Sequence, residues 1–401
     1  MAPPISADAC LVEAASAVAA SPAIAPNGMV RKDVRAPAAI SVVSKQTVRP
    51  AGASAPVGGD LRLSVSDMPM PSCHYIQKGL FFPPPPPGVL TTASLVSSLV
   101  TALSRALGIF PTLAGRLVTL HDDSIVIREP DFRRNFFGDS TAVLRFPGGV
   151  GPAVTFDAEA PLRERILHFS AAAIRELKAT ANHSKRTGHQ DAEANGKLVH
   201  DSRLHGRCSS EISSFQSLCA HIWRAVTRAR RLLADDKTTT FRMAVNCRHR
   251  LRPAISPLYF GNAIQSVATT ATVAELASND LGWAAARLHA TVTSHEDGAI
   301  RCAAAEWEAA PRCFPLGNPD GAALTMGSSP RFPMYDGNDF GWGRALAVRS
   351  DRANKFDGKM SAFPGQAGDG SVDVEVCLAP DTMARLLLDE EFLQYVSSPA
   401  P

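Results

Sequence analysis

The chain has 401 residues, a length that allows one large domain or two domains with separate cores. Hydrophobic residues make up 45% of it and charged residues 20%, a globular composition that excludes a disordered or fibrous protein. With 41 Lys and Arg against 38 Asp and Glu, the formal net charge is only +3. This balance argues against a nucleic-acid partner or a polybasic membrane contact, although a local basic patch for an anionic ligand stays open.

The cysteines and the N-terminal segment bear on location and on metal binding. Eight cysteines are scattered without a C-x-x-C pair or metal-site spacing, which predicts reduced thiols, a cytoplasmic location and no metal. Residues 1–39 are rich in Ala, Pro and Ser, and Asp8 and Glu13 interrupt their apolar stretch, so a disordered extension is expected and not a signal peptide. No apolar run reaches the ~18 residues of a membrane-spanning helix. A plastid transit peptide is the alternative for this segment, because its main charges lie near its end at Arg31, Lys32 and Arg35.

Regular structure is expected from residue 40 onward. Residues 40–52 (ISVVSKQTVRPAG) indicate a short strand, and the alternation of apolar and polar residues over 61–68 indicates a second one. Residues 91–110 predict a helix that Thr91 or Thr92 can cap. Its apolar stripe recurs at every fourth position, at Leu95, Leu99, Leu103 and Leu107.

The middle of the chain is more irregular. Residues 111–118 and 124–129 predict a turn and a strand, after which 128–140 become polar and aromatic. Residues 163–182 predict a strand and then a helix that begins after a Ser170 cap. The polar residues 183–211 predict a crossover linker between two domains.

The last part of the chain is strongly patterned. Residues 213–233 predict an amphipathic helix capped by Ser213 or Ser214, and 238–253 predict a strand followed by a turn. A final strand and a closing helix capped by Asp381 are expected over residues 372–396. Strands and helices alternate throughout, so the fold class is α/β with two layers in each half. The expected domains are the extension 1–39, an N-terminal domain 40–182, the linker 183–211 and a C-terminal domain 212–401.

Four sequence blocks occur in order: FPTLAGRL (110–117), RMAVNCRHRLRPAISPLYFGNAI (242–264), DFGWG (339–343) and NKFDGKMSAFPG (354–365). Together they resemble the BAHD family of plant acyl-CoA-dependent acyltransferases, over nearly the whole chain from Ile40 to Val396. The Asp-Phe-Gly triplet also occurs in protein kinases. The Gly-rich loop, the strand lysine and the His-Arg-Asp loop that a kinase needs are missing from this sequence.

The resemblance implies two chloramphenicol-acetyltransferase-like domains with mixed sheets flanked by helices. A channel between them would admit acyl-CoA from one side and a small-molecule acceptor from the other. The expected cofactor set is therefore acyl-CoA as co-substrate, with no bound cofactor and no metal. A cytosolic monomer is expected, without nucleic-acid or membrane partners.

The same resemblance assigns roles to individual residues. The structural motif would comprise Asp339, Phe340, Gly341, Trp342 and Gly343, with Asp339 paired to Arg248 or, as the weaker alternative, to Arg250. Trp342 could line the channel or fill the core. The candidates for contact with CoA phosphates are Arg344, Lys355 and Lys359, for which solvated surface charge is the alternative.

The general base of the family is the histidine of a His-x-x-x-Asp motif, since acyl transfer requires removal of the acceptor's proton. None of the eleven histidines in this chain has Asp four positions later, and His189, with Glu193, is only a very weak imitation. The family segments before and after the motif meet at Glu129–Pro130, which predicts an internal deletion from splicing or from the gene model. Loss of its strands would truncate the N-terminal domain and expose edges through which the chain could associate.

Two hypotheses follow. The first is an acyltransferase that moves an acyl group from acyl-CoA to a hydroxyl or amine of a small plant metabolite, with doubtful activity of its own because no catalytic histidine is identified. The second is a non-catalytic remnant that binds CoA or a protein partner through its C-terminal domain.

Overall fold

The structure is a computed structural model. It describes residues 10–17, 40–52, 60–84, 91–119, 125–128, 156–194 and 211–397, with short gaps inside these ranges. The chain divides into two compact units, one of residues 1–63 and 84–134 and the other of 64–83 and 135–401. The Glu129–Pro130 junction and most of the expected N-terminal extension lie outside the described residues.

The second unit is built on a six-stranded sheet of order β7-β13-β12-β10-β8-β9. Strand β10 is parallel to β8 and β12, and the other neighbours are antiparallel, so the sheet is mixed as expected. The strands are β7 (Arg163–Phe169), β8 (Thr238–Asn246), β9 (Ile264–Thr272), β10 (Ala323–Met326), β12 (Lys359–Pro364) and β13 (Val372–Leu378).

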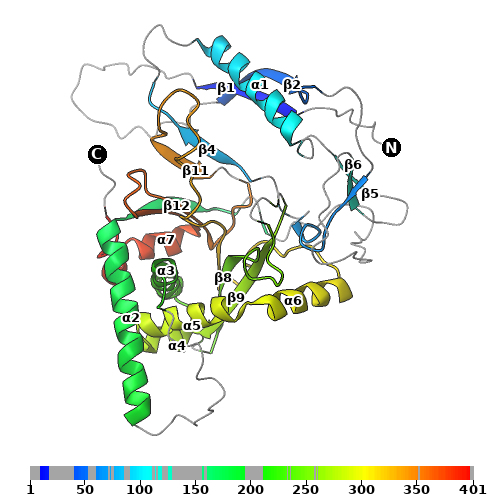
Figure 1. Ribbon diagram of the computed structural model, residues 1–401. Coiled ribbons are helices and arrows are strands. Elements are labelled where there is room, and N and C mark those ends of the chain that lie inside the picture. Colours follow the sequence, from blue (N-terminus) through cyan, green and yellow to red (C-terminus); the bar gives the residue numbers. More distant parts are fainter. Residues whose placement is uncertain are drawn as a thin grey trace, which may run out of the picture. The chain divides into compact units, whose positions relative to one another are not determined.

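Helices cover one face of this sheet. Figure 1 shows α3 (Ser214–Arg230) end-on, with α2 (Ala171–Ala194), α5 (Leu281–Ser294) and α7 (Pro380–Leu386) around it. Ser213 caps α3 in a capping box with Gln216, as the sequence predicts for this residue. Helix α3 is buried on nearly all sides, with the Trp223 and Leu218 side chains fully buried in the main core. The short helices α4 (Val273–Ser278) and α8 (Glu390–Leu393) also contact α3, whereas α6 (Asp297–Ala309) buries Ile300 in a separate small cluster with Cys247 and Leu251.

The opposite face carries a small two-stranded sheet of β4 (Lys78–Phe81) and β11 (Ala347–Ser350). A second apolar cluster of Tyr335, Ala345, Val348 and Phe363 packs there with Leu80, Phe82 and Met334. Since Phe363 lies on β12, this cluster fixes the loop between β10 and β11 against the large sheet. That loop carries the DFGWG motif.

The first unit contains a hairpin of β1 (Cys10–Ala17) and β2 (Ile40–Val48), and a sheet of order β3-β6-β5. The strands of that sheet are β3 (Asp60–Arg62), β5 (Arg116–Thr119) and β6 (Ile125–Arg128). Helix α1 (Thr92–Ile109) begins at a Thr91 capping box, as predicted, and buries Leu107. By length and composition alone α1 is apolar enough to cross a membrane, contrary to the expectation that no segment is, and only 6% of this helix is buried.

Strand β1 lies within residues 1–39 and pairs with β2. Several later elements differ in extent from those expected. The strand expected over 61–68 ends at Arg62, because Asp67 accepts hydrogen bonds from the amide and hydroxyl of Ser64 and closes a turn. Helix α2 runs to Ala194, well into the expected linker, and β7 pairs with β13 of the C-terminal sheet. Asp381 does not cap the closing helix: α7 starts with Pro380, and Asp389 caps the separate α8.

Candidate functional site

The DFGWG loop is held by its own aspartate. The Oδ1 atom of Asp339 accepts hydrogen bonds from the amides of Gly341, at 2.8 Å, and Gly343, at 3.1 Å. Both glycines have left-handed backbones, with φ of 88° and 82°, a conformation that other residues adopt only under strain. The motif therefore specifies a turn whose amides converge on one carboxylate oxygen.

The expected pairing of Asp339 with Arg248 is not formed. The Arg248 guanidinium donates to the carbonyl of Gly261, at 2.6 Å, and lies over the ring of Tyr259, with 5.7 Å from Cζ to the ring centroid. Arg250, the weaker alternative, donates to two backbone carbonyls near the end of α5. Among the described residues no ion pair joins either arginine to Asp339, since each group already has partners close to its own position.

This arrangement makes a prediction about coupling. The variants Asp339→Ala and Arg248→Ala should each destabilise the second unit by about 1 kcal/mol, the net contribution of a lost hydrogen bond. Because the two side chains have separate partners, their effects should add, with a coupling energy below about 0.5 kcal/mol. Urea unfolding of the two single variants and the double variant measures this. A coupling energy above about 0.5 kcal/mol would show that Asp339 and Arg248 interact directly, as the family resemblance implies.

Trp342 belongs to an aromatic group on the surface of this unit. The Phe82 ring meets Phe340 and Trp342 edge-on, with centroid distances of 6.1 and 5.3 Å. Phe340 and Trp342 lie 5.3 Å apart and are tilted by 31°. The Phe340 side chain is 48% exposed and Trp342 is half-buried, so neither fills the main core.

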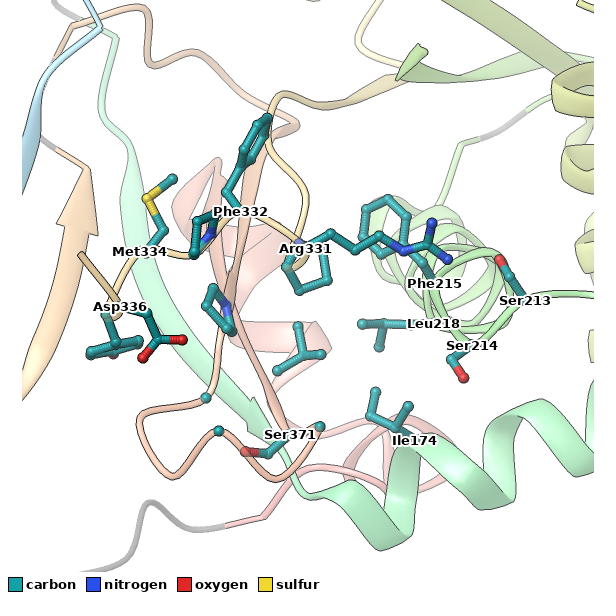
Figure 2. A pocket seen from close by; sticks show the side chains of 18 of the residues that line it. Ile174, Ser213, Ser214, Phe215, Leu218, Arg331, Phe332, Met334, Asp336 and Ser371 are labelled. Carbon is teal, nitrogen blue, oxygen red and sulfur yellow. The ribbon is translucent and has the colours of Figure 1, made fainter. Parts of the chain in front are cut away.

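A pocket of about 550 Å³ lies beside the motif (Figure 2). Its walls come from the loop of residues 330–336, the loop between β12 and β13, the start of α3 and one face of α2. In Figure 2 the Arg331 side chain extends towards Phe215 at the start of α3, while Met334 and Asp336 lie on the far wall. The charged lining residues are Lys178, Arg331, Arg344 and Asp336, so positive charge exceeds negative charge.

Arg344 is the only one of the three expected CoA contacts that lines this pocket, as far as the described residues go. Its Nη2 lies 3.6 Å from Asp336 Oδ1, and its guanidinium lies over the Tyr335 ring at 5.4 Å. The side chain is 42% exposed, so it is free to turn towards an anionic ligand. Lys178 lies on α2 and bonds Glu211 at 2.8 Å.

Lys355 is internal and cannot meet CoA phosphates in this arrangement. Its ammonium contacts Glu164 of β7 and lies 3.0 Å from Glu375 of β13, and only 8% of its side chain is exposed. Burial alone would lower the pKa of Lys355, but its hydrogen bonds to the two glutamates outweigh burial and raise that pKa. The two glutamates come from strands that are distant from Lys355 in sequence.

Lys359 is half-buried on β12, away from the pocket lining. Desolvation lowers its pKa, the opposite of the shift at Lys355. His189 falls within α2, but its side chain lies outside what the structure describes. In the described part of the chain, no three His, Cys, Asp or Glu side chains cluster as metal ligands would.

Sequence reasoning missed Lys178, Arg331, Asp336 and the Ser371 loop as pocket residues. Arg331 and Asp336 lie within ten residues of the DFGWG motif, so their closeness to it in the sequence could have identified them as candidates. Nothing in the sequence marks Lys178 or Ser371, because only the folded sheet brings α2 and the loop between β12 and β13 to the same place.

The mixed sheet with one helical layer, the DFGWG loop and the basic pocket define a chloramphenicol-acetyltransferase-like unit. Solved structures of this fold agree. The chain matches TRI101 of F. sporotrichioides, crystallised with coenzyme A and T-2, with a TM-score of 0.63 at 18% identity over 84% of this chain and 99% of that one. It matches vinorine synthase with a TM-score of 0.58 at 17% identity over 89% and 98% of the two chains.

Sequence comparison identifies the family. The family model described as "Transferase family" matches residues 38–128 and 154–393. The BAHD acyltransferase DCR of Arabidopsis thaliana is 34% identical over 58% of this chain and 44% of its own length. Shikimate O-hydroxycinnamoyltransferase of Nicotiana tabacum is 31% identical over 45% of this chain and 41% of its own. The chain belongs to the BAHD acyltransferase family, and it spans about half the length of the curated relatives it matches.

Proposed function

We propose that the chain is an acyl-CoA-binding member of the BAHD family, with the second unit holding CoA at the pocket beside the DFGWG loop. The reaction that this family membership suggests is acyl transfer from acyl-CoA to a hydroxyl or amine of a small plant metabolite. The observation that carries the proposal is the position of Arg344, which follows the motif directly and lines a pocket with excess positive charge. The planar guanidinium group of arginine binds phosphate oxygens through paired hydrogen bonds, so Arg344 is suited to contact the phosphates of CoA.

The sequence limits how fast this chain can turn over. Attack of a hydroxyl on a thioester requires a base, and no histidine here is followed by Asp four positions later. The family match also stops at residue 128 and resumes at 154, next to the Glu129–Pro130 junction. The missing His-x-x-x-Asp motif supports a missing segment that would carry the base. Full-length transcript sequences across residues 126–136 test this, because a restored His-x-x-x-Asp-Gly would assign catalysis to the longer protein alone.

The CoA site gives the next prediction. Arg344→Ala should weaken CoA binding about tenfold, the effect of losing one charge-assisted contact of about 1.4 kcal/mol. Isothermal titration calorimetry of the purified chain with CoA measures the dissociation constant. The matched control is Arg312→Ala, which removes an exposed arginine that lines no part of the pocket. Unchanged affinity in Arg344→Ala, or an equal loss in the control, would contradict the proposed site.

The second candidate function is a non-catalytic remnant that binds CoA, or a protein partner, without transferring an acyl group. The absence of the His-x-x-x-Asp sequence favours it over a working enzyme. Release of free CoA from acetyl-CoA in the presence of small alcohols and amines separates the two. Transfer that is lost in His189→Ala would support an enzyme, whereas binding without transfer supports the remnant. We retain a cytoplasmic monomer as part of the proposal, and size-exclusion chromatography with light scattering tests its oligomeric state.

A further inference from the structure

Lys359 is an amine without a counter-charge. It lies at the first position of β12, on the sheet face opposite the helices, since Met360 and Ala362 point into the helical core. Among the described residues, no carboxylate pairs with its ammonium and no oxygen accepts a hydrogen bond from it. Its Nζ lies over the ring of Phe356, 6.0 Å from the centroid. This sets it apart from Lys355, which two glutamates hold four residues earlier.

The surroundings of Lys359 favour the neutral amine. The Nζ atom packs against Gly327 of the neighbouring segment, where any Cβ would overlap it, and Gly327 donates its amide to the Met360 carbonyl at 2.9 Å. Burial lowers the pKa of Lys359, Cys73 opposes this shift, and the ammonium of Lys78 adds to it. A lysine that is desolvated and next to a second cation is the type that proteins use as a nucleophile.

We propose that the ε-amine of Lys359 is an acyl acceptor, acylated by thioesters without any other catalytic group. The neutral nitrogen attacks the thioester carbonyl, a C–N bond forms and the C–S bond breaks. The thiolate leaves, and the proton that the nitrogen loses ends on that thiolate. The product is a stable amide on β12, so the reaction is stoichiometric and differs from the catalytic transfer proposed above.

The test uses a small thioester, S-acetyl-N-acetylcysteamine, which does not need the CoA pocket, in parallel with acetyl-CoA. Peptide mass spectrometry of the full chain gives the initial acetylation rate of each lysine between pH 7 and pH 10. At pH 8 we expect Lys359 to exceed Lys178 roughly threefold or more, because burial lowers the pKa of Lys359, whereas Lys178 is engaged in an ion pair with Glu211. Lys78, which donates to the Ser350 hydroxyl at 2.7 Å, is the second reference. A rate at Lys359 equal to or below that of Lys178 would overturn the proposal, whatever the outcome of the CoA binding experiment.

Three variants sharpen the test. Lys359→Arg should abolish the signal at residue 359 and leave Lys178 unchanged. Gly327→Ala keeps the lysine but displaces its amine towards solvent, so the midpoint of its acetylation rate against pH should rise relative to the parent chain. Cys73→Ser should leave the acetylation of Lys359 intact. Loss of Lys359 acetylation in Cys73→Ser, or acetyl groups on Cys73 alone, would show that the thiol and not the amine takes the acyl group.

Discussion

Lys355→Met is expected to destabilise the second unit by about 3–5 kcal/mol, the cost of breaking a buried ion pair from one side. The substitution keeps the length of the side chain but leaves Glu375, which is about as buried as Lys355, without its cation. Among the described residues, Glu375 would then keep the amide of Ser350, at 3.0 Å, as a donor and the more distant charge of Lys78 as a cation. Urea unfolding followed by tryptophan fluorescence measures the change, because all four tryptophans lie within the second unit.

Two control variants test whether the loss of stability comes from the buried ion pair. Lys178→Met breaks an exposed pair with Glu211 and should cost at most about 1 kcal/mol. The double variant Lys355→Met/Glu375→Gln removes the stranded charge and should recover part of the loss. CoA affinity should be the same in Lys355→Met and the parent chain. If Lys355→Met lost little stability but bound CoA more weakly, Lys355 would contact CoA and not serve as an internal ion-pair partner.

Lys355 and Lys359 show where sequence reasoning ends. They lie four residues apart in the same block, and both were expected at CoA phosphates. In the structure one is held by Glu164 of β7 and Glu375 of β13, while the other packs against Gly327. The residues that give the two lysines different surroundings, Glu164, Glu375 and Gly327, all lie outside this sequence block. Their identical chemistry therefore gave no means of telling them apart before the sheet order was known.

The expectations that hold are those with local causes. Thr91 and Ser213 cap their helices because the hydroxyl, the amide three residues on and the side chain there are all specified within one turn. The mixed α/β fold followed from the resemblance of four ordered blocks. The domain boundary expected at residues 183–211 rested on polarity alone, whereas the pairing of β7 with β13 joins positions 205 residues apart, as at His168 and Asp373. Such pairing depends on the whole sheet.

Asp339 illustrates a different limit. Its pairing with Arg248 was taken from the family resemblance, and the residues that match the motif are all present. Within this chain, however, the carboxylate is satisfied by Gly341 and Gly343, and the arginine by the carbonyl of Gly261. The turn at residues 339–343 thus depends on residues of the motif itself, while the partner of Arg248 is determined by neighbours that the motif does not contain.

The stability of the second unit should fall as the pH drops from about 6.5 to about 4, because of His221. This side chain is 2% exposed, stacked on Phe392 at 5.3 Å and edge-on to Tyr395 at 5.0 Å. Burial lowers the pKa of His221 from 6.5 to about 4, and the hydrogen bond to the Phe392 carbonyl offsets this only in part. Between these two values the unfolded chain binds a proton that the folded chain excludes, so protons favour unfolding. The gap corresponds to about 3 kcal/mol once the pH is below both pKa values.

The variant His221→Gln separates this effect from the titration of carboxylates. Glutamine can still donate to the Phe392 carbonyl but carries no charge at any pH, so its stability should change less between pH 7 and pH 4. The difference in the free energy of unfolding between parent and variant, measured by urea titration across this range, should shrink by about 3 kcal/mol towards pH 4. Parallel pH profiles for the two proteins would show that His221 is protonated in the folded state as readily as in the unfolded one. Glu391, whose charge raises the His221 pKa, would then have to hold the imidazolium against the opposing charges of Arg228 and Arg224.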